Sequence, residues 1–267
     1  MLWLAWIFAC TPSPSLQAAP VPLEPPASPP APAPVWPDPL ALKILPSAPS
    51  PVRLLLDAGH GAPANSGNRN WRCEAEQDFS RRITDSVAAL LTLRGLHPLR
   101  TRPDALLVSY PERLRQSHNS DYLISLHSDS RAGLEIQQDA QGCLHNHGAQ
   151  GFAILWSDEG TAALVAQRQA LAHALGRRLT EAGFLPYPGQ DYMGLYGQDI
   201  VPGVFLDRHE AKKRIMLLRR PAVPSVIIET HQAWDQAEAE AWENPLTHAA
   251  FAGALAAALF DISIQPD

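Results

Sequence analysis

The chain has 267 residues, of which 46% are hydrophobic and 18% charged, and its formal net charge at pH 7 is −6. A nucleic-acid-binding domain carries a surplus of basic residues, so this acidic balance excludes a nucleic-acid partner. After residue 10 no uninterrupted apolar stretch approaches the roughly 18 residues of a membrane span, which excludes a polytopic membrane protein.

The amino terminus reads as a signal sequence. Met1 to Ala9 form an apolar run that ends just before Cys10, and residues 1–9 are predicted to be a signal peptide. The tetrapeptide Ile7-Phe8-Ala9-Cys10 resembles a bacterial lipobox, which predicts lipidation of Cys10 and attachment to the periplasmic face of a membrane in the cell envelope. The alternative is a misassigned start, because the run is short and no Lys or Arg precedes it.

The prolines divide the rest of the chain. Fifteen of the 26 lie between Thr11 and Pro51. Each proline removes a backbone donor and fixes φ, so a packed domain does not use one at every third position. Residues 10–51 are therefore predicted to be a disordered Pro/Ala-rich tether, and residues 52–267 a single folded domain.

Strands and helices alternate along the folded part. Apolar runs predict strands at residues 52–57, 97–101, 122–126, 151–156, 215–218 and 225–229. Helical spacing of apolar residues predicts helices at 76–94, 111–118, 162–182 and 245–260. This order predicts an α/β domain with a mainly parallel central sheet and helices on both faces. Residues 131–150 and 184–208 fit no element, and loops of that length are usually functional or mobile.

Two cysteines remain in the folded part. If Cys10 carries lipid, Cys73 and Cys143 form an even pair in an oxidising compartment. They are either bonded to each other or two free buried thiols, and the sequence leaves both interpretations open.

Polar residues that suit metal chemistry follow the predicted strands. His60, His127 and Glu229 stand at the ends of three strands, and the carboxyl ends of parallel strands border the ligand site of an open α/β sheet. Two imidazoles and one carboxylate form a catalytic zinc set, and a further carboxylate can act as general base. Spacing alone leaves Glu74 and Glu76 as alternatives for the carboxylate ligand.

Five ordered motifs resemble those of the zinc-dependent N-acetylmuramoyl-L-alanine amidases of bacterial cell-wall turnover, over nearly all of residues 52–262. They are Asp57-Ala58-Gly59-His60-Gly61, Glu76-Gln77-Asp78 followed by Gly95, Thr101-Arg102, Ser125-Leu126-His127-Ser128-Asp129, and Leu218-Arg219 followed by Pro224 and Glu229.

The resemblance implies a function and a ligand set. One zinc ion per chain is held by His60, Glu76 and His127, which resolves the choice between the two glutamates. Glu229 is the catalytic carboxylate, and the reaction is hydrolysis of the peptidoglycan amide between N-acetylmuramic acid and L-alanine. Peptidoglycan is the expected partner, and a requirement for an activator protein stays open.

Several roles keep an alternative. Arg219 either pairs with a stem-peptide carboxylate or is a structural arginine, and Asp57 either orients His60 or caps a turn. The family pattern Glu-x-Gly-Phe-x-Ser-Asn is here Glu229-Thr230-His231-Gln232-Ala233-Trp234-Asp235, which changes the lip of the site. His231 is an added acid, a substrate contact or, as the favoured alternative, a plain residue of the lip. The alternative functions are a non-catalytic peptidoglycan-binding lipoprotein and a zinc carboxypeptidase that cuts another wall amide.

Overall fold

The computed structural model describes residues 39–47, 52–104, 106–131, 136–189, 194–210 and 213–264. The predicted signal peptide and the predicted lipidation of Cys10 lie outside the described residues, as does most of the predicted tether.

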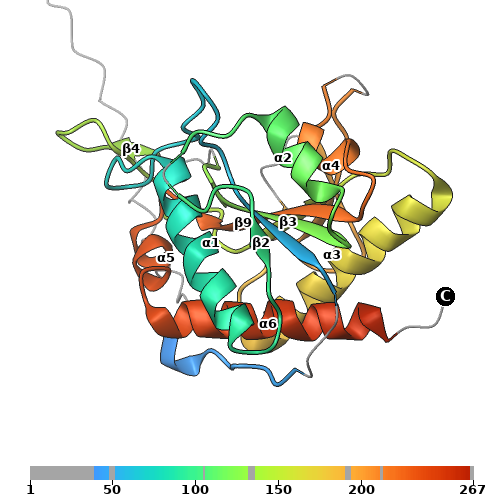
Figure 1. The fold of residues 1–267 in the computed structure, drawn as a ribbon. Helices are drawn as coiled ribbons and strands as arrows, with labels where there is room; N and C mark the ends of the chain where they lie inside the picture. The colour runs from blue at the N-terminus through green and yellow to red at the C-terminus, as the bar shows by residue number, and fades with distance from the viewer. Residues whose placement is uncertain are drawn as a thin grey trace, which may run out of the picture. The chain divides into compact units, whose positions relative to one another are not determined.

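A seven-stranded sheet in the order β2-β1-β3-β9-β6-β8-β7 forms the centre of the domain (Figure 1). Strands β2, β1, β3 and β9 are mutually parallel, whereas β6 is antiparallel to β9 and parallel to β8, and β7 is antiparallel to β8. The strands are β1 Leu54–Ala58, β2 Leu99–Arg100, β3 Tyr122–Asp129, β6 Ala153–Trp156, β7 Tyr196–Gln198, β8 Val204–Asp207 and β9 Ser225–Gln232. A separate hairpin pairs β4 Gln137–Gln138 with β5 Leu144–His145. The predicted mainly parallel α/β sheet is confirmed.

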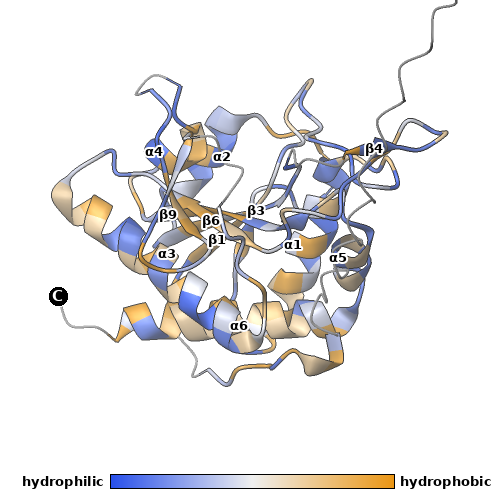
Figure 2. Cartoon of the chain, turned by 180° about the vertical axis from the view of Figure 1, so that it is seen from behind, coloured by the Kyte–Doolittle hydropathy of each residue, from blue (hydrophilic) through white to orange (hydrophobic). Residues whose placement is uncertain are grey.

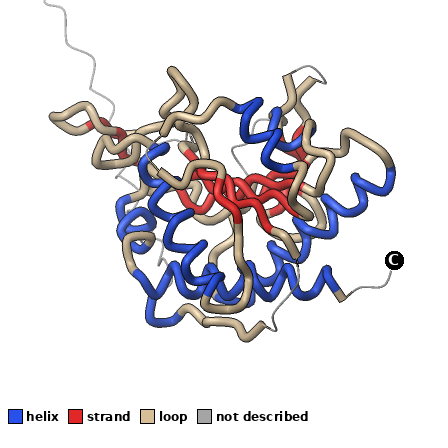
Figure 3. Tube along the Cα trace, viewed as in Figure 1, coloured by secondary structure: helices blue, strands red, loops and turns tan. Residues whose placement is uncertain are grey.

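Helices cover both faces of this sheet. The helices are α1 Glu76–Thr92, α2 Tyr110–Ser117, α3 Ala162–Ala182, α4 Met216–Arg219, α5 Gln236–Ala241 and α6 Pro245–Ser263. In the view of Figures 1 and 3, α6 runs below the strands, α1 lies to their left and α3 to their right, and α2 and α4 lie above them. The strands that these layers enclose are coloured as hydrophobic in Figure 2, as expected for strands buried on both faces.

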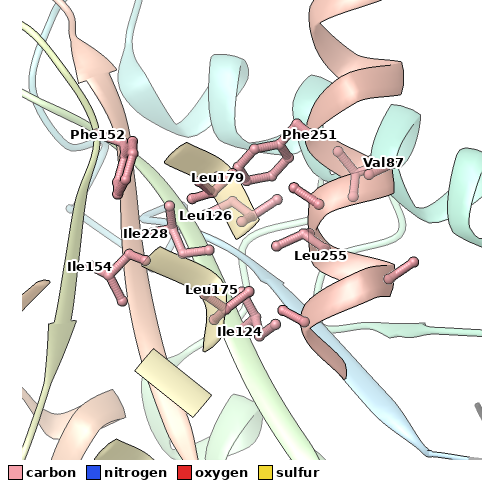
Figure 4. Close-up of a cluster of buried hydrophobic side chains, with 14 of the residues drawn as sticks. Val87, Ile124, Leu126, Phe152, Ile154, Leu175, Leu179, Ile228, Phe251 and Leu255 are labelled. Atoms are coloured by element: carbon pink, nitrogen blue, oxygen red, sulfur yellow. The ribbon is translucent and has the colours of Figure 1, made fainter. Parts of the chain in front are cut away.

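The main core lies between the sheet and α1, α3 and α6. Figure 4 shows Ile124, Leu126 and Ile228 from the sheet facing Leu175 and Leu255 from the helices. Helix α6 is long and apolar enough to span a membrane by length and composition, but 61% of its apolar window is buried in the domain. A helix that is apolar all round is a core helix when other elements surround it.

Two predictions are wrong: the type of one element and the residue at which the folded domain begins. Residues 215–218 were expected to form a buried strand, but Met216–Arg219 is helical. A four-residue apolar run fits either element, and here Leu218 packs onto the sheet beside Ile227. The predicted tether also extends too far, because residues 39–47 pack against the domain. Leu45 is buried in the main core, and the Lys43 N–H donates to the Ala182 carbonyl at 2.9 Å.

A disulfide joins Cys73 to Cys143, with 70 residues of separation and 5.2 Å between the Cα atoms. It connects the loop before α1 to the start of β5. The structure thus selects the bonded alternative for this pair.

Removing this bond should destabilise the domain. We expect the double variant Cys73→Ser and Cys143→Ser to lose about 2–4 kcal/mol of unfolding free energy, because the open loop regains entropy in the unfolded chain. Urea unfolding of the oxidised wild type and the variant measures the difference. Wild-type protein treated with reductant is the control and should match the variant, and equal midpoints for oxidised and reduced protein would contradict the prediction.

Candidate metal centre

Three parallel strands and one helix bring the predicted site residues to one edge of the sheet. His60 follows β1, Glu76 is the first residue of α1, and His127 and Glu229 are partners in the register of β3 and β9. The strand prediction ended before His127, whereas β3 continues to Asp129. All four residues lie at the carboxyl ends of their strands or at the helix start beside them, as the rule for open α/β sheets requires.

His60, Glu76 and His127 form a group that could hold a metal ion, with ligand atoms that all lie within 4.8 Å of one another. Glu76 Oε2 is 3.0 Å from His60 Nε2, and Glu76 Oε1 is 3.0 Å from His127 Nδ1. Glu74 does not join this group, because its carboxylate pairs with Arg82. The geometry therefore agrees with the choice of Glu76.

The charges in this group are those of a ligand set. Burial raises the pKa of Glu76, but the hydrogen bonds from His127 and His60 outweigh burial and lower that pKa to about 2. Burial lowers the pKa of each histidine, but the hydrogen bond and charge of Glu76 outweigh it and raise both pKa values. An ionised carboxylate between two imidazoles, to which no Lys or Arg of the described part of the chain is bonded, suits a divalent metal.

The loop between His60 and Glu76 and the end of β3 each donate one backbone N–H group to the Glu76 carboxylate. The Asn68 N–H donates to Glu76 Oε2 at 3.0 Å and the Ser128 N–H donates to Oε1 at 3.1 Å. Gly67 has a φ of +77°, and a Cβ there would lie 2.5 Å from Glu76 Oε2. Glycine is thus required at this position both by backbone conformation and by space.

Asp57 supports the centre through a serine, which is an arrangement that neither sequence interpretation of Asp57 contained. Ser125 Oγ donates to Asp57 Oδ2 at 2.5 Å and lies 3.1 Å from His127 Nε2. Thr101 Oγ1 donates to the other carboxylate oxygen at 2.6 Å. Because the Ser125 hydroxyl donates its proton to Asp57, it accepts a hydrogen bond from the Nε2–H group of His127. The Nδ1 atom of His127 then carries the lone pair, which faces the metal position.

His60 is oriented by different partners. Its Nδ1 lies 2.8 Å from Asn65 Oδ1, and its carbonyl accepts from Arg113 Nη2. Asn65 in turn donates to the Tyr110 hydroxyl at 2.9 Å. Asn65 and Arg113 could not be predicted from the sequence, because neither belongs to a family motif and both act through contacts that only the fold creates.

Glu229 has a carboxylate oxygen free for chemistry. Its Oε2 is buried and has no hydrogen-bond partner among the described residues. Burial raises the pKa of Glu229 to about 8, with a further upward contribution from the charge of Asp129. A buried, unpartnered carboxylate costs stability, so its position beside a metal-ligand group points to a catalytic role.

The expected substrate contact of His231 is wrong. Between the pairs His127–Glu229 and Asp129–Gln232, β9 advances three residues while β3 advances two. This bulge reverses the alternation of β9, so His231 turns into the core, where only 2% of it is exposed. There its ring stacks on Trp242, with ring centroids 5.9 Å apart.

This burial predicts a pH dependence of stability. Burial lowers the pKa of His231 to about 3, whereas an unfolded histidine titrates near roughly 6.5. The unfolded chain binds the extra proton, so stability falls as the pH drops through this window. Between pH 7 and pH 4.5 the unfolding free energy of wild type should fall. In His231→Phe this fall should be smaller by about 2–3 kcal/mol, because the group that takes up the proton is absent. Urea unfolding of chelator-treated protein tests this, and parallel pH profiles would contradict it.

Arg219 was a predicted substrate contact, whereas Arg131 was not among the predicted site residues. Arg219 Nε donates to the Arg214 carbonyl at 3.2 Å, and a contact to a stem peptide stays a prediction. Arg131 was not predicted, because it stands alone in a segment without periodicity. It is buried, contacts Asp129 at 2.7 Å and lies with its guanidinium 4.0 Å above the Tyr187 ring.

A buried His-Glu-His group at the carboxyl edge of an α/β sheet, with a free carboxylate beside it, is the arrangement of a metal-dependent hydrolase. The family model described as N-acetylmuramoyl-L-alanine amidase matches residues 54–261. The chain therefore belongs to the N-acetylmuramoyl-L-alanine amidase family and is a peptidoglycan amidase. No individually curated protein matches it.

Solved amidase structures share the fold. The amidase Ami1 of Mycobacterium smegmatis is 20% identical with a TM-score of 0.62, and the match covers 81% of this chain and 99% of that chain. The amidase AmiC2 of Nostoc punctiforme is 18% identical with a TM-score of 0.54, covering 80% and 98%. The CwlD amidase of Clostridioides difficile, solved in complex with the GerS lipoprotein, is 17% identical with a TM-score of 0.56, covering 80% and 100%.

Proposed function

We propose that this amidase is zinc-dependent and that it hydrolyses the amide between the lactyl group of N-acetylmuramic acid and L-alanine. The observation that carries the proposal is the unpartnered Oε2 of Glu229 beside the three ligand atoms. Zinc is the expected ion because two imidazoles and one carboxylate leave a position open for water and substrate.

His60, Glu76 and His127 would hold the ion. Bound zinc supplies Lewis-acid activation of the attacking water and of the scissile carbonyl. Glu229 accepts the proton of the attacking water and passes it to the departing α-amine of alanine. Glu229 Oε2 is the atom available for this exchange, because it has no hydrogen-bond partner among the described residues.

Ser125 and Asp57 keep the His127 ring in the orientation that ligation needs. Asn65 does the same for His60. These contacts come from the protein's own side chains, which set the ring orientations of both histidines.

We place the enzyme in the cell envelope, on the periplasmic face of a membrane through a lipid on Cys10, or free in the periplasm. Family membership supports this location, since peptidoglycan is outside the cytoplasm, and the Cys73–Cys143 bond fits an oxidising compartment. One similar amidase was solved with a lipoprotein bound, which supports a search for a protein partner here.

Mass spectrometry of purified peptidoglycan after incubation with the full chain tests the proposal. Stem peptides with a free L-alanine amino group should appear, disappear on chelation and return with added zinc. Cleavage of a different wall amide would indicate a carboxypeptidase, and an unchanged wall with zinc still bound would indicate a binding protein.

A further inference from the structure

Three segments outside the predicted helices and strands are joined by backbone hydrogen bonds. The Trp71 N–H donates to the Ala233 carbonyl at 3.0 Å, and the Asn146 N–H donates to the Trp234 carbonyl at 3.0 Å. The disulfide ties the first of these segments to the β4–β5 hairpin. Figures 1 and 2 both show β4 standing out beside α1, whose first residue is the ligand Glu76.

These segments carry an aromatic surface, which we call the tryptophan platform: Trp71, Arg72, His145 and Trp234. The Arg72 guanidinium lies 4.6 Å from the centre of the Trp71 ring, and the His145 ring meets that indole edge-on at 6.1 Å. Trp234 Nε1 donates to the Arg69 carbonyl at 3.0 Å. Both indoles are partly exposed, and neither belongs to a core cluster.

The platform is fixed in place and also open to solvent. Backbone hydrogen bonds and the disulfide hold the three segments together. The Trp234 indole has its hydrogen bond to Arg69, and the Trp71 indole contacts Arg72 and His145. Large, rigid aromatic side chains of this kind contribute binding area at little cost in conformational entropy. Trp234 bonds to the Arg69 carbonyl, and the preceding residue, Asn68, donates to the ligand Glu76. The platform therefore borders the metal centre, which indicates a binding surface.

The charges around the platform favour a saccharide over a peptide carboxylate. Arg72 lies 3.7 Å from Glu240, and Arg69 donates to the Cys73 carbonyl at 3.1 Å. Glu240 thus offsets the charge of Arg72, and Arg69 has a carbonyl acceptor within its own loop. His145 and Asp139, 3.2 Å apart, supply a donor and an acceptor for hydroxyl or acetamido groups. An indole face packs against the C–H face of a pyranose ring, with weak C–H contacts.

In the sequence, the two tryptophans of the platform are close to the ligand Glu76 and to the proposed base Glu229. Trp71 precedes Glu76 by five residues, and Trp234 follows Glu229 by five. We propose that the tryptophan platform binds the glycan strand of peptidoglycan next to the muramoyl residue whose amide is cut. This inference rests on the proposed function and names a subsite for its substrate.

Binding of peptide-free glycan tests the platform without turnover. The probe is a set of oligosaccharides of alternating N-acetylglucosamine and N-acetylmuramic acid, titrated by calorimetry into the full chain. We expect Trp71→Ala to weaken binding by about tenfold or more, as for an aromatic hot spot. Trp71→Phe, which keeps an aromatic face, should restore most of the affinity. Trp234→Phe keeps an aromatic ring but removes the hydrogen bond to the Arg69 carbonyl. This variant should also keep most of the glycan affinity.

Kinetics and a control variant complete the test. Trp71→Ala should raise KM for polymeric peptidoglycan by about tenfold with little change in kcat, since the platform does not touch the reacting atoms. A muramoyl-peptide fragment with a single sugar should be cut as by wild type. His147→Ala alters an exposed side chain that follows the same hairpin and should bind glycan as wild type does. Zinc content and free thiols are measured in every variant.

A wild-type measurement covers the case in which a variant misfolds. Glycan should protect Trp71 and Trp234 from oxidation by N-bromosuccinimide, read by peptide mass spectrometry. Unchanged glycan affinity in Trp71→Ala, absence of protection, or displacement of the glycan by a free stem peptide would overturn the proposal. If glycan binding depends on Trp71 but no stem peptide is released from the wall, the proposed function is wrong and the platform assignment stands.

Discussion

Glu229→Gln should lower kcat by about 10²–10⁴-fold while zinc content stays unchanged, because general acid–base catalysis contributes an acceleration of that size. Glutamine keeps the shape of the side chain but cannot accept the proton of the attacking water. Glu229 lies outside the group of ligand atoms, so the ion should remain bound. Stem-peptide release and metal analysis of the same preparation measure the two effects together.

Glu238 provides a matched control for this substitution. Its carboxylate is also buried, and burial also raises the pKa of Glu238 to about 8. It accepts N–H groups from Gly151 and Gln232 at 2.7 Å each, which is a structural role. Glu238→Gln should therefore lower stability more than it lowers kcat. Wild-type turnover in Glu229→Gln, or equal losses of kcat in both variants, would show that Glu229 is not the base.

Glu76→Ala should remove zinc from the centre and activity with it. The substitution deletes the ligand that lies between the two histidines, so zinc affinity should fall by more than the ~10–100-fold typical of residues that only orient a ligand. It also leaves the Asn68 and Ser128 N–H groups without their acceptor, at a cost of about 1–3 kcal/mol for each buried donor. Competition with a fluorescent zinc chelator measures the affinity, and urea unfolding measures the stability.

Glu74→Ala is the control, since Glu74 is two residues away and was the alternative ligand from spacing alone. It pairs with Arg82 in a partly exposed ion pair, and such pairs contribute roughly 0–1 kcal/mol. Zinc affinity and turnover should stay at wild-type levels. Retention of zinc by Glu76→Ala, or loss of zinc from Glu74→Ala, would contradict the assigned ligand set.

The sequence determined the parts of the site that depend on local pattern. Buried apolar runs that end in His60, His127 and Glu229 specify strands, and parallel strands necessarily place their ends at one edge. Gly95 and the helical spacing after Glu76 specify α1. These features follow from backbone periodicity and turn chemistry, so they could be predicted without knowing the neighbours of any residue.

Only the tertiary structure decided the rest. One extra residue in β9 turned His231 from the lip of the site into the core. Leu45 extended the domain into the proline-rich part. Ser125 became the link between Asp57 and His127. Each outcome depends on contacts between segments far apart in the chain. Local pattern fixes which face a side chain would take in a regular element, but packing decides where regularity breaks and which polar groups meet.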